Sequence, residues 1–326
     1  MKKFSLAWVA CLWATAFSLF ADSTNFVTKT LIGVDVNNPT SIDIGPDGRV
    51  YLSTQEGLIY AYSVERSVKG DYSVTDTEVI DIIQTIPNHD DDGALSVSVS
   101  TRQVTGIMVK GTARNPVIYV SSSDPRIGGG ASRGDLNLDT NSGTLSRLIW
   151  DGIEWLKVDL VRGLPRSEEN HANNGMDLDE STNMLYLTVG GFTNAGSPSN
   201  NFAFISEYAY SACIVRVDLD ALDLLPIQTS GDTHFVYDLP TVDDPTRSNV
   251  NGITDPSNSG YVGDINDPFG GNDGLNMAKL DVSSPVQIFS SGFRNAYDVV
   301  ITEAGNIYTW DNGGTFDSAT QCCFCQ

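Results

Sequence analysis

The stretch SIDIGPDGRVYLSTQEGLIYAYSV, residues 41–64, decides the fold class of this chain. Apolar and polar residues alternate over 41–44 and again over 50–53, with the turn-forming run GPDG between them at 45–48. A second turn, QEG, leads into a third alternating segment over 58–64. A period of two residues interrupted by Gly, Pro and Asp predicts antiparallel strands joined by tight turns.

The same pattern recurs along the chain in the segments VTGIMVKGTARNPVIYVSSSD (104–124), NNGMDLDESTNMLYLTVGG (173–191) and RNAYDVVITEAGNIYTWDNGG (294–314). The first strands of these units begin near residues 40, 104, 174 and 295, and no long segment has a helical period. Repeated strand units of this kind predict an all-β protein, a β-propeller of four-stranded antiparallel blades. The last interval, about 120 residues, is long enough for an extra blade or an insertion.

The two ends of the chain differ in composition from the middle. Lys2 and Lys3 precede an apolar run over 6–20, which is too short to span a bilayer and predicts a secretory signal peptide at 1–21, with cleavage after Ala16 as the alternative. Residues 22–315 are then the propeller, secreted into the periplasm or the extracellular medium, with no later membrane span. The Cys-rich residues 316–326 are an aberrant tail without the spacing of a disulfide framework or a zinc site.

The net charge of −22, from 41 acidic and 19 basic residues, excludes nucleic acid as a partner because phosphate binding needs a basic surface. Acidic residues in an exported protein either bind calcium or make the surface soluble. The segment DLNLDTNSG (135–143) places oxygen side chains at alternate positions, like the start of a calcium loop, but Ser146 stands where such a loop closes with Glu. Asx-turns are the alternative interpretation of Asp135–Gly143.

The residues just before the repeated first strands are expected to meet at one end of a propeller, since the loops entering the innermost strands converge there. They are Gln103, His171, Arg294 and Asn295. His171 is one of three histidines and lies in the polar segment GLPRSEENHANNG (163–175), which predicts an exposed loop and leaves a solvated histidine as the alternative. The segment GGFTNAGSPSNNF (190–202) follows the next strand pair and is expected to line the same pocket.

Two of these segments carry a resemblance to a known family. GLPRSEENH (163–171) and SSGFRNAYDVVITEAGNIYTWDNGG (290–314) resemble segments of the soluble pyrroloquinoline-quinone-dependent glucose/sorbosone dehydrogenases, which are six-bladed propellers. The resemblance implies that His171 is the catalytic base, that Arg294, Asn295 and Gln103 contact the quinone, and that the carbonyls of Gly313 and Gly314 bind Ca²⁺.

The resemblance also has two departures. Asn170 stands where the family often has an acidic residue before the histidine, so the sequence does not identify the group that orients the imidazole. The chain accommodates about four blades of six, and the cofactor-binding Lys and Arg residues of later blades have no counterpart in it. The sequence therefore predicts a propeller truncated at its C-terminus.

Three functional hypotheses follow. The first is an exported oxidoreductase that oxidises a sugar hydroxyl, with His171 as general base, the quinone as hydride acceptor, calcium as Lewis acid and an external electron acceptor. The second is a non-catalytic propeller module that binds carbohydrate or a protein partner within a larger secreted protein. The third, a calcium-dependent hydrolase, would need carboxylates converging on the axis, and the predicted strand starts do not supply them.

Overall fold

The computed structural model describes residues 27–91, 93–128, 136–194, 196, 198, 200–230, 233–244 and 276–313. Strands dominate these residues, and the one α-helix among them is the five-residue α1 (Leu219–Asp223). The all-β prediction is therefore confirmed. The predicted signal peptide (1–21), Gly314 and the tail 316–326 lie outside the described residues.

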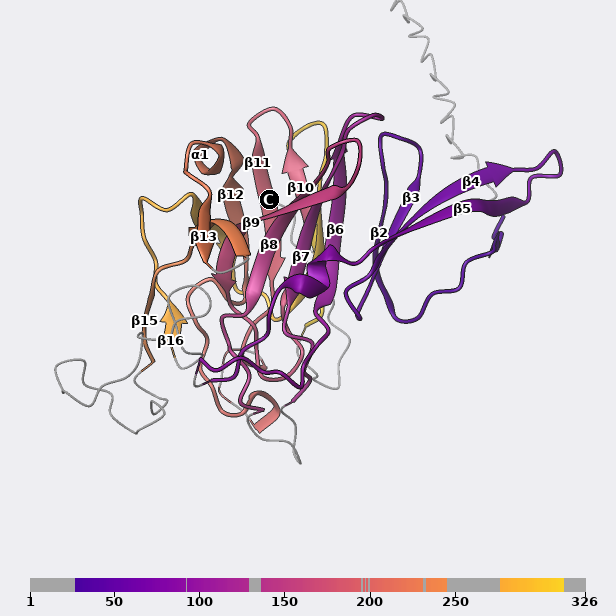
Figure 1. Ribbon diagram of the computed structural model, residues 1–326. Coiled ribbons are helices and arrows are strands. Elements are labelled where there is room, and N and C mark those ends of the chain that lie inside the picture. The colour runs from indigo at the N-terminus through magenta and orange to yellow at the C-terminus, as the bar shows by residue number, and fades with distance from the viewer. Residues whose placement is uncertain are drawn as a thin grey trace, which may run out of the picture.

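The first two blades are antiparallel meanders. Blade one consists of β2 (Pro39–Ile44), β3 (Val50–Thr54), β4 (Ile59–Arg66) and β5 (Tyr72–Ile80), with β1 (Leu31–Ile32) parallel to β5. Blade two consists of β6 (Gln103–Gly111), β7 (Pro116–Ser123), β8 (Gly143–Trp150) and β9 (Trp155–Leu164). Figure 1 shows blade one in indigo and purple beside blade two. The turns between the first three strands fall where GPDG and QEG predict them.

The third blade is closed by a strand that lies far away in the sequence. It consists of β10 (Asn173–Asp179), β11 (Met184–Val189), β12 (Cys213–Asp218) and β17 (Val286–Ser291), in that order across the sheet. The hairpin β18 (Ala296–Ile301) and β19 (Ile307–Asp311) forms the fourth unit. The predicted inner strands near 40, 104, 174 and 295 are thus β2, β6, β10 and β18.

The four inner strands pack side by side. Val109 N on β6 donates to Asp43 Oδ2 on β2 at 2.6 Å. Ile301 N on β18 donates in the same way to Asp177 Oδ2 on β10 at 2.8 Å. The Tyr297 hydroxyl on β18 lies 3.3 Å from the carbonyl oxygen of Thr40 on β2, so the first and last inner strands also touch. Four-stranded units joined at their inner strands are the arrangement of a β-propeller, and that prediction is confirmed.

Apolar clusters between neighbouring blades hold the units together. One cluster joins blades two and three through side chains such as Leu160, Leu187 and Val215, all fully buried. Another joins blades one and two around Ile59 and Trp155, whose indole N–H donates to Glu78 at 2.7 Å. Each such side chain contributes roughly 1.5–3 kcal/mol by leaving water. Apolar and polar residues alternate along the strands because the side chains of one strand face must fill the space between two blades.

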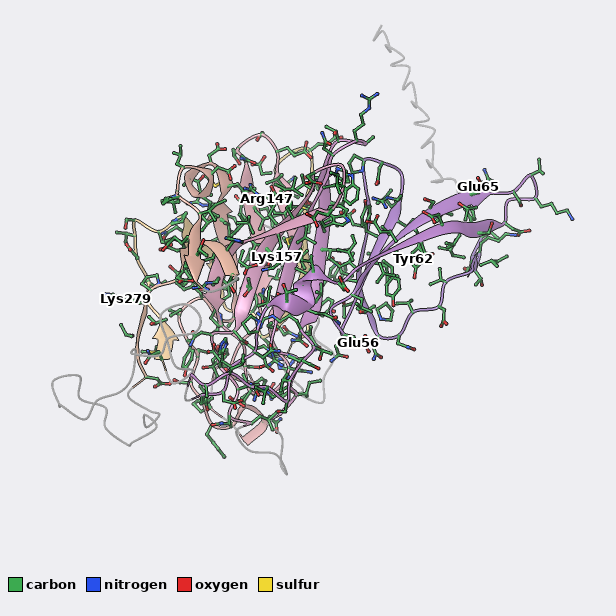
Figure 2. All side chains as sticks on the ribbon, viewed as in Figure 1. Glu56, Tyr62, Glu65, Arg147, Lys157 and Lys279 are labelled. Atoms are coloured by element: carbon green, nitrogen blue, oxygen red, sulfur yellow. The ribbon has the colours of Figure 1, made fainter. Side chains whose placement is uncertain are left out.

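The β4–β5 hairpin of blade one extends away from the other blades. Figure 2 shows it projecting, with Tyr62 and Glu65 on its strands. The rings of Tyr60 and Tyr62 stack with centroids 5.8 Å apart, and the Arg66 guanidinium lies over Tyr72 at 5.7 Å. Both contacts join side chains of this hairpin to one another and stabilise it.

The long interval before residue 295 contains an insertion within blade three, and the described residues show no extra blade there. After β12 the chain forms α1 and the hairpin of β13 (Gln228–Ser230) and β14 (Thr233–Asp238), and β14 pairs in parallel with β9 of blade two. Arg162 on β9 fixes it, with Nε and Nη2 at 2.5 and 2.6 Å from the Asp238 carboxylate. The short pair β15 (Thr241–Asp243) and β16 (Asn276–Ala278) follows before β17 returns to β12.

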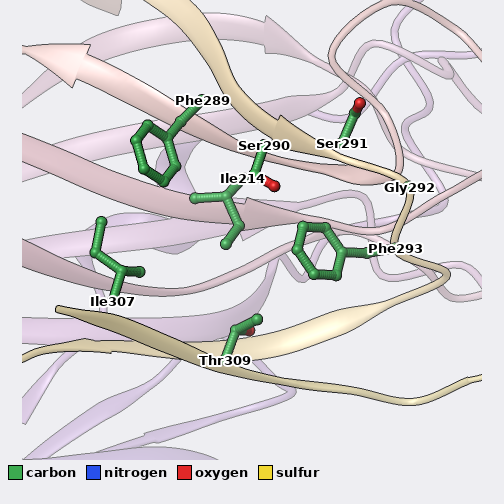
Figure 3. Close-up of a pocket in the computed structure, with 8 residues that line it drawn as sticks. All are labelled: Ile214, Phe289, Ser290, Ser291, Gly292, Phe293, Ile307 and Thr309. Carbon is green, nitrogen blue, oxygen red and sulfur yellow. The ribbon is translucent and has the colours of Figure 1, made fainter. Parts of the chain in front are cut away.

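An apolar cavity of about 170 Å³ lies between blade three and the β18–β19 hairpin. Figure 3 shows Ile214 and Phe289, from β12 and β17, opposite Ile307 and Thr309 from β19. Phe289 is 39% exposed, so two strands leave the outer half of blade three only partly covered. How many blades the whole ring holds stays a prediction.

Candidate functional site

The loop that carries His171 is buried, and the prediction of an exposed loop is wrong. His171 is 2% exposed, and its backbone N–H donates to Ser167 Oγ at 3.0 Å. The guanidinium of Arg166, fully buried, donates to the backbone carbonyls of Asp124, Arg126 and Ser167. Because one arginine satisfies three carbonyls, a polar segment can lie inside the protein.

The imidazole of His171 is held in one tautomer. Its Nδ1 lies 2.8 Å from the carbonyl oxygen of Gly191. A carbonyl can only accept, so Nδ1 carries the proton and Nε2 is left as an acceptor. The Gly191 carbonyl thus orients the ring, the role for which the sequence, with Asn170 before the histidine, identifies no group.

The surroundings of His171 favour the neutral ring. Phe202, 1% exposed, covers it with the ring centroids 4.9 Å apart. The pKa of His171 is lowered to about 3, mainly by burial and next by the nearby positive charge of Arg294, while the bond to the Gly191 carbonyl has a smaller opposite effect. The imidazole is therefore uncharged at neutral pH.

Arg294 and Asn295 are anchored directly before β18 by one carboxylate. Asp311, on the paired strand β19, accepts the backbone N–H of Arg294 at 3.0 Å and that of Asn295 at 2.8 Å. The Arg294 side chain donates from Nε to Asn194 Oδ1 at 2.8 Å and from Nη1 to the Asn312 carbonyl at 3.2 Å. Its Cζ lies 5.9 Å from the centre of the Phe202 ring. Phe202 therefore contacts both the imidazole and the guanidinium.

Asn295 joins blade three to the β18–β19 hairpin. Its Oδ1 accepts from Asn174 Nδ2 at 2.9 Å, and the same amide nitrogen lies 3.0 Å from the Ala296 carbonyl oxygen. With Oδ1 occupied by Asn174, the side-chain NH₂ of Asn295 is the group left for a ligand.

The pair Gly190–Gly191 brings the histidine segment and the arginine segment together. Gly190 N donates to Ala172 O at 2.8 Å, and Gly191 N donates to Arg294 O at 2.7 Å. Gly191 is thus bonded to Arg294 through its N–H and to His171 through its carbonyl. These glycines were missed as key residues in the sequence, although the segment 190–202 was expected near the pocket and its Asn194 and Phe202 do reach the site.

Replacing Gly190 with alanine is expected to separate the two halves of this site. A Cβ there would lie 2.6 Å from Asn295 Oδ1 and 2.7 Å from His171 Cβ, closer than real Cβ contacts. Such overpacking costs about 1–3 kcal/mol. Urea unfolding should show this loss, whereas Gly196→Ala, at a position with φ +86° and open space, tests strain without a clash. Equal losses in both variants would contradict the proposed close packing.

Among the described residues, no side-chain hydrogen bond joins the other predicted site residues to this group. Gln103 is 3% exposed and donates to Ser123 Oγ at 2.8 Å, within its own blade. Gly313 lies two residues after β19 on the surface, and Gly314 is outside the described residues. His171, Arg294 and Asn295 are therefore the predicted residues that the fold brings together.

Metal-binding features are sparse in the part of the chain that the structure describes. It holds no cluster of three or more His, Cys, Asp or Glu side chains suited to a metal. In the predicted calcium loop, Asp135 lies outside the described residues, and Asp139 Oδ1 accepts the Asn141 N–H at 2.8 Å, which is an Asx-turn. The predicted calcium site at Gly313 and Gly314 would use backbone carbonyls, so it stays a prediction. No helix in the described residues is long and apolar enough to cross a membrane.

No family model matches the chain, and no curated protein sequence matches it. Three of the solved structures similar to it are the holo pyranose dehydrogenase quinone domain of Coprinopsis cinerea (15% identity, TM-score 0.44), the quinone-bound aldose sugar dehydrogenase of Streptomyces coelicolor (13%, 0.39) and a Trichoderma reesei carbohydrate-active enzyme of family AA12 (13%, 0.42).

The matches cover 91%, 86% and 88% of this chain and 49%, 58% and 76% of those proteins, respectively. The chain thus spans about half the length of the first two structures. At these identities and TM-scores, the function must be argued from the chain's own residues.

Proposed function

We propose that this chain is an exported, quinone-dependent oxidoreductase that oxidises a hydroxyl group of a sugar. The observation that carries the proposal is the assembly of His171, Arg294 and Asn295 around Phe202 and the Gly190–Gly191 corner. The two sequence segments that resemble the quinone-dependent sugar dehydrogenases are the segments that the fold joins here.

The donors at this site fit pyrroloquinoline quinone, which bears carboxylates and quinone oxygens. Arg294 supplies a positive charge, and its side chain donates to the neutral oxygens of Asn194 and of the Asn312 carbonyl. Asn295 supplies an NH₂ donor, and Gln103 is the third proposed contact. Carbonyls at Gly313 and Gly314 would hold Ca²⁺, which would supply a Lewis acid for the quinone.

His171 is proposed to accept the proton of the sugar hydroxyl at Nε2 while Nδ1–H stays bonded to the Gly191 carbonyl. A bound quinone would supply the acceptor for the hydride, and its turnover would require an external electron acceptor. Arg294 stabilises negative charge that develops beside it. An anion next to Arg294 also offsets the charge that lowers the pKa of His171, so the imidazole becomes a stronger base when the site is filled.

The test is reconstitution of the purified protein with pyrroloquinoline quinone and CaCl₂, followed by calorimetric binding and dye-linked oxidation of a panel of aldoses. Saturable binding is expected, and Arg294→Ala should weaken it about tenfold or more, because a charge-assisted bond is lost. Arg216→Ala, at an exposed position on β12, is the matched control. A folded protein that binds sugar, does not bind the quinone and does not reduce the dye would overturn the proposal in favour of a carbohydrate-binding module.

A further inference from the structure

The Gly190–Gly191 corner, which links His171 to Arg294, is followed by residues that bond to the carboxylate of Glu207. The proposed mechanism gives this carboxylate no role. Glu207 lies in the loop between β11 and β12. Its Oε2 accepts the backbone N–H of Phe192 at 2.8 Å, and its Oε1 accepts the Thr193 hydroxyl at 2.5 Å. The Ser211 hydroxyl lies 2.6 Å from Oε2.

Glu207 also packs directly on Gly191. A Cβ on Gly191 would lie 2.9 Å from Glu207 Oε1, so the carboxylate lies against Gly191 and is bonded to the two residues that follow it. The Thr193 hydroxyl also accepts the backbone N–H of Gly196 at 2.9 Å, so the bond to Glu207 restrains the chain as far as Gly196. Glu207 is thus bonded to the two residues that follow Gly191, and the Phe192 N–H that it accepts belongs to the same peptide unit as the Gly191 carbonyl.

The segment around Glu207 is conformationally strained, which indicates that its contacts are needed to keep it in place. Ala203, Phe204, Tyr210 and Ala212 have φ of +52°, +62°, +66° and +53°, values that residues with a side chain seldom adopt. Such conformations persist only when surrounding contacts impose them, and they concentrate at functional sites. The Glu207 bonds lie in the middle of this strained run.

We propose that Glu207 is a positioning residue: it fixes the Gly191 carbonyl, and that carbonyl keeps the proton of His171 on Nδ1 and leaves Nε2 to accept the substrate proton. The link to the reaction rests on the proposed function, but the link to the tautomer does not. The hydrogen bond made by one ring nitrogen decides where the proton sits, so a displaced carbonyl releases the ring. A merely structural role would lower stability without changing the tautomer.

The tautomer can be measured directly, because only three histidines are present. In ¹⁵N-histidine-labelled protein near pH 7.5, wild-type His171 is expected to show a protonated Nδ1 and an unprotonated Nε2. In Glu207→Ala the single tautomer should be lost, and in Glu207→Gln it should be partly kept, since the amide oxygen still accepts. On the reconstituted enzyme, kcat should fall by about 10–100-fold in Glu207→Ala with little change in the KM for sugar.

Asp179→Ala is the matched control, because Asp179 makes a similar set of bonds to Ser181 N, Ser181 Oγ and Thr182 Oγ1 (3.0, 2.7 and 2.8 Å) in an exposed turn. It should leave the His171 signals unchanged. If Glu207→Ala does not fold, Thr193→Val and Glu207→Gln replace it in the test. Thr193→Val removes one bond to Glu207 and keeps the shape of the side chain.

An unchanged His171 tautomer in the folded Glu207 and Thr193 variants overturns the proposal. If the wild-type tautomer depends on Glu207 but no sugar is oxidised, the positioning role stands and the proposed function fails. The two failures are therefore distinguishable.

Discussion

His171→Ala is expected to lower the rate of dye-linked sugar oxidation by about 10²–10⁴-fold, the usual contribution of a general base. The imidazole is the buried acceptor that the fold places beside Arg294, and alanine removes Nε2 without adding a group that could replace it. Quinone affinity should change little, because Arg294 and Asn295 are anchored by Asp311 and not by the histidine. The measurement is kcat for the best sugar of the panel, together with a calorimetric Kd for the quinone.

The control for this prediction is another histidine of the same chain. His234 is exposed on β14, in the hairpin added to blade two, and His234→Ala should keep wild-type activity. His171→Gln separates base strength from volume, since glutamine fills the space but is not a base; it should be as inactive as alanine. Activity within about threefold of wild type in both His171 variants would remove this residue from the mechanism.

Acid is expected to destabilise the protein through two histidines, the buried His171 and the half-buried His89. Burial is the main cause that lowers the pKa of His171 to about 3 and that of His89 to about 4, and the charge of a nearby arginine adds to it in both cases. The unfolded chain has histidine pKa values of about 6.5, so at pH 5 the unfolded state binds about two protons that the folded state does not.

The sign of this effect follows from the lowered pKa values. The free energy of unfolding is highest above pH 6.5, falls as the pH drops below it, and the contribution of His171 stops growing near pH 3. That contribution is at most about 5 kcal/mol, the free energy equivalent of the full shift. The protein should therefore be markedly weaker at pH 5 than at pH 7.5.

Urea unfolding at several pH values between 5 and 7.5 measures the proton uptake as the slope of stability against pH. His171→Gln should reduce the uptake near pH 5 by about one proton, His89→Gln by about one more, and the double variant should remove both contributions. A slope that is the same in wild type and in His171→Gln would mean that the folded imidazole titrates normally, which contradicts its burial beside Arg294.

Much of the fold was predictable because the strands are encoded by near neighbours. Alternation over 41–44 and 50–53 with GPDG between them specifies β2, its turn and β3, since side chains of one strand face must be apolar to fill the space between blades. The same local code places β6, β10 and β18 within one residue of the positions expected, and it allowed the prediction that loops before these strands meet. For His171, Arg294 and Asn295 that prediction holds, whereas Gln103 bonds within its own blade.

Other features depend on residues that are distant in the sequence. The fourth strand of blade three is β17, which reaches β12 only after the insertion containing α1 and β14, and alternation says nothing about which edge a strand will join. The burial of the polar loop before β10 depends on Arg166 reaching carbonyls about 40 residues away in the chain. Composition predicted exposure there because it cannot show where a side chain's partners lie.

The sequence by itself determined the strands, the turns and the family-like segments that carry His171, Arg294 and Asn295, because each depends on residues close to it in the chain. Only the tertiary structure decided that the Gly191 carbonyl orients the imidazole, that Phe202 covers it and that Glu207 holds the corner. A hydrogen bond of 2.8 Å between His171 and Gly191 depends on how the chain closes between two blades. The packing of segments that are distant in the sequence decides how these two residues meet, and no local sequence pattern predicts that packing.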